Sequence, residues 1–138
     1  MGFEVYLDCF ENGKPSSIRK SFVRTLFPIV DEESKPDFWS VKYDAENRCK
    51  IGVRPAGAGT ELVSGIYVER PCGDLLLWEG LFRLMQSGNI VLYFPGCPRP
   101  LIANPAAASH LPTEMVQALG SPRCLESSEQ LRKAVAQD

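Results

Sequence analysis

Three side chains in this sequence are candidates for nucleophilic catalysis: the thiols of Cys72 and Cys97 and the imidazole of His110. Cys72 directly precedes a predicted helix, and the positive end of a helix lowers the pKa of a nearby thiol. A small cysteine-dependent enzyme is therefore one hypothesis. Asp74, two residues further on, would oppose a thiolate, and no base lies nearby in the sequence. A packing role for Cys72 is favoured for these reasons.

His110 is the only histidine, so any Cys–His or Ser–His pair would have to use it. It stands just before a predicted helix, where an imidazole completes a turn or caps the helix, and we favour that structural role. A zinc site would need distant cysteines to converge on this histidine, and the five cysteines form no CxxC pair. Residues 57–60 lack the GxxxxGK[ST] pattern of a phosphate-binding loop. The sequence therefore predicts no metal site and no cofactor.

Acidic side chains gather in one polar stretch beside a tryptophan. The carboxylates of this stretch are Asp31, Glu32, Glu33 and Asp37. Such a cluster is usually a solvated face, but it can also form a contact surface for a basic partner, where charge speeds encounter and fixes register. Trp39 is either a core residue or an exposed anchor of the kind that dominates interfaces. These five residues are the candidate partner-binding site.

Composition narrows the class of protein. The chain has 138 residues, 44% of them hydrophobic, which suffices for one domain with a substantial core and argues against disorder. Its net charge of −2 gives no basic excess for binding phosphate backbones, so nucleic acid is disfavoured as a partner. The N-terminus lacks a secretory signal pattern, and no apolar run approaches the ~20 residues of a membrane-spanning helix. We expect a cytoplasmic protein with reduced cysteines.

Residues 74–96 are the stretch around which the fold must be built. Asp74 is a favoured residue type for a helix N-cap, and apolar residues then recur at three- and four-residue steps, which predicts a helix in the core. Gly80 is expected to permit close approach of another element, and Gly88 to supply a left-handed turn after the helix. The unbroken apolar run over residues 90–94 predicts a strand that is covered on both faces.

The remaining chain alternates between strand and helix patterns. We expect strands over residues 3–9, 38–44, 49–53 and 61–70, with Leu62 and Ile66 on one face of the last and Val63 on the other. Helices are expected from a serine cap at residue 16 or 17 to about residue 27, over 113–119, and from 127 or 128 through 135. The sequence thus predicts a single α+β domain, with a mainly antiparallel sheet, one βαβ crossover and helices packed on it.

Three stretches of the chain resemble a group of small bacterial cytosolic proteins of uncharacterised function: FEVYLDCFENGKP, VERPCGDLLLWEGLFRLMQSGNIVLYFPGCPRPLI and HLPTEMVQALG. The resemblance covers most of the chain. Similar small acidic proteins look like immunity proteins, which neutralise a toxin domain encoded beside them. The resemblance therefore implies a binding role, and it carries over no catalytic residue.

The leading functional hypothesis is a non-enzymatic protein-binding domain, an immunity protein that occludes the active site of a cognate toxin. The acidic stretch would supply the charge complementarity. One alternative is the cysteine-dependent enzyme that uses Cys72 or Cys97 with His110. Another is a regulatory subunit that self-associates through an exposed part of the sheet. A protein partner is expected, and neither nucleic acid nor a membrane.

Overall fold

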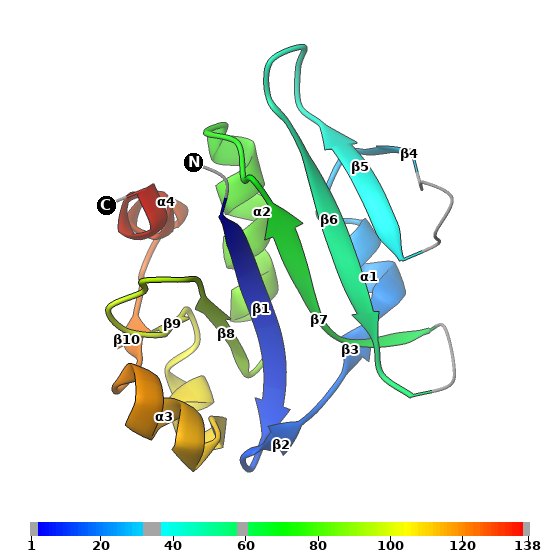
Figure 1. Cartoon of the computed structure of the whole chain (residues 1–138). Coiled ribbons are helices and arrows are strands. Elements are labelled where there is room, and N and C mark those ends of the chain that lie inside the picture. The colour runs from blue at the N-terminus through cyan, green and yellow to red at the C-terminus, as the bar shows by residue number, and fades with distance from the viewer. Residues whose placement is uncertain (1–2, 32–36, 58–60, 137–138) are drawn as a thin grey trace.

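The computed structural model describes residues 3–31, 37–57 and 61–136 (Figure 1). Its strands form a mainly antiparallel sheet in the order β10-β9-β8-β1-β7-β6-β5-β4, while β2 pairs with β1 and β3 with β7. The strands are β1 (Glu4–Glu11), β2 (Lys14–Pro15), β3 (Ile18–Arg19), β4 (Ile29–Asp31), β5 (Phe38–Lys42), β6 (Arg48–Pro55), β7 (Leu62–Glu69), β8 (Ile90–Tyr93), β9 (Leu101–Ile102) and β10 (Arg123–Cys124). The helices are α1 (Lys20–Arg24), α2 (Leu75–Gln86), the 3-10 helix η1 (Pro105–His110), α3 (Thr113–Leu119) and α4 (Ser128–Ala136).

The predicted crossover consists of β7, α2 and β8, with β1 inserted between its two strands. β1 pairs antiparallel with β7 on one side and antiparallel with β8 on the other, so β7 and β8 run parallel to each other without being neighbours. Figure 1 shows α1 and α2 behind the sheet, and α4 packs against α2. The predicted α+β fold class, with a mainly antiparallel sheet and helices packed on it, is confirmed.

The central helix α2 lies in the core because its apolar residues cover most of its circumference. Asp74 caps it as predicted, since its Oδ1 accepts a hydrogen bond from the backbone N–H of Leu76 at 2.8 Å. Leu77, Leu81 and the other apolar residues of the helix interior are buried. Burying a leucine side chain stabilises the fold by roughly 1.5–3 kcal/mol, so this helix is a main source of stability.

The predictions for two glycines of this region, Gly80 and Gly88, have different outcomes. A Cβ on Gly80 would press against the backbone oxygen of Leu26, so this glycine does permit the close approach that the sequence predicts. The predicted left-handed turn at Gly88 is wrong. The helix ends at Ser87 in right-handed geometry, with φ −74° and ψ −11°, and the Ser87 hydroxyl donates to the Leu84 carbonyl at 2.6 Å. The side-chain hydrogen bond satisfies that carbonyl without a glycine turn.

Strand β8 is covered on both faces, as its unbroken apolar sequence predicts. Ile90 and Leu92 belong to the main core with α2, whereas Val91 points to the opposite face. There it packs with Ile102 in a second, smaller core that η1 and α3 cover. The side of the sheet that faces away from α2 is therefore closed over β8 and β9 by these two short helices.

Two predicted details of the N-terminal half are wrong. The helix expected over residues 16–27 is only α1, because Ile18 and Arg19 pair with β7 as strand β3 instead. Arg54 and Pro55 follow each other in β6, but they pair with Gly65 and Val63 of β7, so one extra residue of β7 bulges out of the strand. The bulge shifts the alternation of faces, and Val63 is therefore buried while Leu62 is exposed.

Among the described residues, no helix has both the length and the apolar character that crossing a membrane would require.

Candidate binding surface on the open sheet face

A row of aromatic side chains crosses the face of the sheet that is turned away from α2. In order from β5 to β8, the row consists of Phe38, Gly52, Tyr67, Tyr6 and Tyr93, each directly opposite the next in the strand register. The ring centroids lie 6.5 Å apart for Phe38–Tyr67, 6.4 Å for Tyr67–Tyr6 and 5.4 Å for Tyr6–Tyr93. Aromatic pairs attract at roughly 4.5–7 Å, so the four rings form one continuous aromatic row.

Gly52 is the position that makes the aromatic row continuous. A Cβ at this residue would collide with the ring of Tyr67, which therefore lies flat across β6 only because the residue there is glycine. Two cations border the row. The Nζ of Lys50 lies 5.5 Å from the centroid of Phe38, and the guanidinium carbon of Arg54 lies 5.7 Å from that of Tyr6. Both distances suit a cation–π interaction.

Asp8 forms a partly buried polar network beside the aromatic row. Its Oδ1 accepts a hydrogen bond from Nη2 of Arg54 and its Oδ2 accepts one from the Tyr93 hydroxyl, each at 2.5 Å. The Asp8 side chain is only 14% exposed. Because Asp8, Arg54 and Tyr93 come from β1, β6 and β8, the network links strands within a run of four neighbours and holds two groups of the surface in fixed positions.

The hydroxyl groups of Tyr6 and Tyr93 stay protonated at neutral pH, because the pKa of each is raised. Burial, followed by the hydrogen bond to Asp8, raises the pKa of Tyr93 to about 12. The Tyr6 hydroxyl donates a hydrogen bond to Oε1 of Glu4 at 2.6 Å, and this bond is the main reason that the pKa of Tyr6 is raised. Hydroxyls in this state donate hydrogen bonds to a neighbour, and they are poorly suited to act as nucleophiles or bases.

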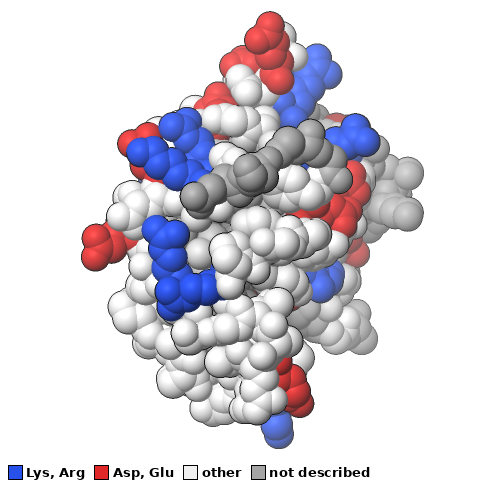
Figure 2. Space-filling model, turned by 60° about the vertical axis from the view of Figure 1, so that its left-hand side comes forward, with Lys and Arg blue, Asp and Glu red and all other residues white. Residues whose placement is uncertain are grey.

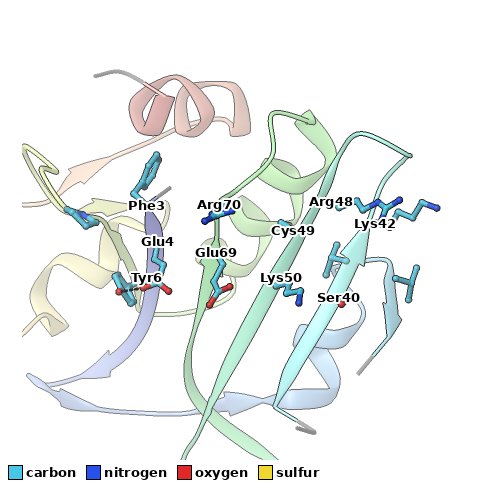
Figure 3. A pocket seen from close by; sticks show the side chains of 13 residues that line it. Phe3, Glu4, Tyr6, Ser40, Lys42, Arg48, Cys49, Lys50, Glu69 and Arg70 are labelled. Carbon is cyan, nitrogen blue, oxygen red and sulfur yellow. Dashed lines mark hydrogen bonds between the residues drawn. The ribbon is translucent and has the colours of Figure 1, made fainter. Parts of the chain in front are cut away.

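A groove of about 960 Å³ adjoins the aromatic row at the end of the sheet where β1 begins. Tyr6 is shared between the row and the groove. Figure 3 shows the carboxylates of Glu4 and Glu69 over β1 and β7, and the cationic side chains of Lys42 and Arg48 over β5 and β6. The groove therefore has two carboxylates on one side, where Arg70 stands beside Glu69, and cations on the other side, and it is open to solvent along the sheet face.

The acidic stretch predicted as the partner-binding site is described only in part. Asp31 is exposed at the end of β4, while Glu32 and Glu33 lie outside the described residues. The Oδ1 of Asp37 accepts a hydrogen bond from Nζ of Lys20 at 2.9 Å, so this carboxylate already has a cationic neighbour within the chain. The acidic stretch stays a prediction as a contact surface.

The interpretation of Trp39 as an exposed anchor is wrong. Its side chain is 0% exposed and lies on the core face of β5, on the same side as Val41. The guanidinium carbon of Arg24 in α1 lies 5.4 Å from the tryptophan ring. The strand alternation that buries Val41 also buries Trp39, so the core alternative is the correct one.

The described structure does not bring His110 to either candidate thiol. The Nδ1 of His110 accepts a hydrogen bond from the backbone N–H of Asn12 at 3.1 Å, and its carbonyl accepts one from Gly13 at 2.9 Å, beyond the C-terminal end of β1. Cys72 and Cys97 lie beyond the other end of β1, after β7 and β8 respectively. His110 thus completes a turn. No group of three or more potential metal ligands occurs among the residues that are described.

The side of the molecule that carries β9, η1 and α3 has a different character. Residues 100–122 contain one charged residue, Glu114. Figure 2 shows this side as a largely uncharged surface, with most charged groups nearer its upper part. Rings and charges of both signs are instead combined on the part of that side of the sheet over β1, β7, β6 and β5, which we call the open sheet face; Tyr93 of β8 lies next to it and packs against the smaller core.

Searches against protein-family models, curated proteins and solved structures find no match to this chain. Similarity to other proteins therefore assigns no family, and the chemistry of the surface is the guide to function.

Sequence reasoning missed the aromatic row and the groove. A signal for part of the row is present, because Glu4, Tyr6 and Asp8 alternate with the apolar residues of the first strand. That alternation predicts which side chains share the outer face of one strand. It does not predict which strands are neighbours, and only the strand order places Tyr6 between Tyr67 and Tyr93.

Proposed function

We propose that this chain is a non-enzymatic binding domain whose partner is another protein, and that the partner lies on the open sheet face. The observation that supports this proposal is the aromatic row with charged groups along its sides. Tyrosine is enriched among the residues that supply most of the binding energy at interfaces. Charges of both signs around such anchors fix the orientation of the partner.

A protein fits this surface better than a nucleic acid does. Nucleobases stack on aromatic platforms, and the aromatic row alone would suit them. The carboxylates of Glu4, Asp8 and Glu69, however, stand among the rings and would repel a phosphate backbone. The net charge of −2 gives no compensating attraction.

In its specific form, the proposal is that the protein is an immunity protein that covers the active site of a toxin domain in the cytoplasm. The resemblance of the sequence supports this form, and so do five cysteines that are all free thiols. A protein that inhibits by covering an active site needs no reactive group of its own. It requires a surface that is ordered before binding, and the Asp8 network supplies order because it fixes Arg54 and Tyr93.

The experiment is to co-express the protein with the product of the adjacent open reading frame and to measure their affinity by calorimetry. A complex is expected, and Tyr67→Ala is expected to weaken it by about tenfold or more, as truncation of an interface anchor does. Gln117→Ala on the exposed side of α3 is the matched control and should leave the affinity unchanged. Absence of a complex, or a complex that is indifferent to Tyr67→Ala, contradicts the proposal.

Light scattering on the purified protein tests the self-association alternative. A monomer is expected. A dimer that dissociates in the Tyr67→Ala variant would show that the open sheet face binds a second copy of the chain instead of a different protein.

A further inference from the structure

Two pairs of like charges, of opposite sign, lie on the two sides of the groove. Glu4 lies directly opposite Glu69 in the pairing of β1 with β7, and Lys42 lies directly opposite Arg48 in the pairing of β5 with β6. All four side chains line the groove. Like charges directly opposite each other in a sheet are destabilising, so each pair opposes the fold that contains it.

The described part of the chain does not neutralise either pair. None of the ion pairs found among its residues includes Glu4, Glu69, Lys42 or Arg48. Lys50 is opposite Glu69 in the register, but its Nζ lies over the Phe38 ring. The polarity of the groove is therefore available to a ligand.

We propose that the groove binds a short segment of the partner polypeptide, which presents a basic side chain to Glu4 and Glu69 and an acidic side chain to Lys42 and Arg48. This inference rests on the proposed function and gives the chemistry of the partner. The rings of Phe3 and Tyr6 line the acidic side of the groove and add cation–π attraction for a guanidinium or ammonium group.

The width of the groove sets the spacing of the two partner side chains. Glu4 on β1 and Lys42 on β5 are the members of the two pairs that lie farthest apart, and their strands are three neighbours apart in the sheet order, or about 14 Å at the usual strand spacing of about 4.8 Å. An extended chain advances about 3.3 Å per residue. A basic and an acidic residue about four positions apart in an extended segment would therefore meet the two charged pairs together.

The backbone that lines the groove just beyond β7 is unusual at Arg70. This residue has φ 48°, a left-handed conformation that is uncommon outside glycine, and its N–H donates to the Phe3 carbonyl at 3.2 Å. Such conformations gather at ligand-binding sites, where the surrounding structure maintains them. Here the turn ends β7 immediately after Glu69, and Figure 3 shows the Arg70 side chain beside Glu69, beyond the end of that strand.

The first test is a titration of the isotope-labelled full chain with short peptides, followed by NMR. The probe is acetyl-RGGGD-amide, and the controls of equal length are acetyl-RGGGR-amide and acetyl-DGGGD-amide. The mixed-charge peptide should bind about fivefold more tightly than either control, the scale of a small number of exposed ion pairs. It should shift the amide signals of Glu4, Glu69 and Arg48. Equal affinity for the three peptides overturns the proposal.

A second test separates binding from folding. Glu69→Gln should weaken the mixed-charge peptide about fivefold and at the same time raise the urea midpoint of the free protein, because it removes like-charge repulsion. Glu114→Gln on α3 makes the same charge change outside the groove and should leave peptide binding unchanged. A lower midpoint in Glu69→Gln would show that this carboxylate has a structural role, and it would overturn the proposal.

Free arginine and aspartate, at the same concentrations as the peptide, test whether the groove binds a linked segment, and the NMR amide shifts are again the measurement. Equal shifts would show that the groove takes separate small ions and would overturn the proposal of a linked segment.

The partner protein distinguishes this inference from the proposed function. If Tyr67→Ala loses affinity for the partner protein but Glu69→Gln and Arg48→Gln do not, the proposal for the groove is wrong and the proposed function stands. If the mixed-charge peptide binds selectively but the neighbouring gene product forms no complex, the proposed function is wrong and the proposal for the groove stands.

Discussion

Arg54 and Asp8 form an ion pair across the strand that separates them, with Nη2 and Oδ1 2.5 Å apart. Gly65 of that strand lies opposite both residues in the register, and a Cβ there would collide with the Asp8 carboxylate. The absence of one side chain thus lets a cation on β6 reach an anion on β1. The same carboxylate accepts a hydrogen bond from Tyr93, so a polar network that spans β6, β7, β1 and β8 depends on a single glycine.

Gly65→Ala is expected to lower the free energy of unfolding by about 2 kcal/mol, in the range for overpacking an ordered site. The added methyl group meets the backbone oxygen of Leu7 as well as Asp8, and backbone cannot move aside as a flexible side chain can. Urea unfolding measures the change. Gly73→Ala is the control, because a Cβ there has open space, and it should be nearly neutral. Equal stability of the two variants would contradict the importance of this contact.

The parts of the fold that the sequence predicts are those that local chemistry determines. Asp74 caps its helix with its own carboxylate, and the apolar run of β8 is covered on both faces, since both features depend on neighbours along the chain. Trp39 is buried because it shares a strand face with Val41.

The parts that escape prediction depend on pairing between distant segments. Ile18 lies in a sequence that suits a helix, but it becomes a strand because Val63 is available beside it. The bulge in β7 reverses the faces of Leu62 and Val63, and Gly65 beside it is a signal for a bulge that does not give its exact position. The candidate surface is formed by such pairings between distant strands, so the sequence pattern predicts a binding site at the acidic stretch instead.

Stability is expected to fall as the pH rises from about 10 to about 12. The folded-state pKa of Tyr93 is raised to about 12, and that of Tyr43 is raised in the same direction, in both cases mainly by burial. A raised pKa means that the folded state holds the proton more tightly than the unfolded state. The resulting stability is complete below the unfolded pKa near 10 and is lost as the pH passes the folded pKa. Urea midpoints across this range measure the loss.

The Tyr93→Phe variant is the control for this pH dependence. It removes one titrating hydroxyl, so its stability should fall less steeply with pH than that of the unmodified protein. At neutral pH it should be less stable by about 1 kcal/mol, because the Asp8 carboxylate loses a hydrogen bond. An unchanged slope above pH 10 would show that Tyr93 does not contribute to the alkaline loss.

The five thiols are expected to react with iodoacetamide in a fixed order at about pH 8. Cys124 is exposed and should be alkylated first. Cys9 and Cys49 are buried, and burial raises the pKa of both thiols, that of Cys49 to about 12, so little thiolate is present. Mass spectrometry of the digested protein measures the order, and alkylation in urea is the control in which all five should react. Early modification of Cys49 in the folded protein would contradict this burial.

Gly52→Ala is expected to impair binding while leaving the fold intact. Its methyl group would meet only the far end of the Tyr67 ring, which is half-buried and can swing away, so the free energy of unfolding should change by no more than about 1 kcal/mol. The displaced ring would break the aromatic row between Phe38 and Tyr6. Affinity for the partner, measured by calorimetry, should therefore fall as far as in Tyr67→Ala, although the tyrosine itself is retained. Gly73→Ala should bind normally. If Gly52→Ala kept full affinity for the partner while Tyr67→Ala lost it, the partner would contact Tyr67 itself and would not need the continuous aromatic row.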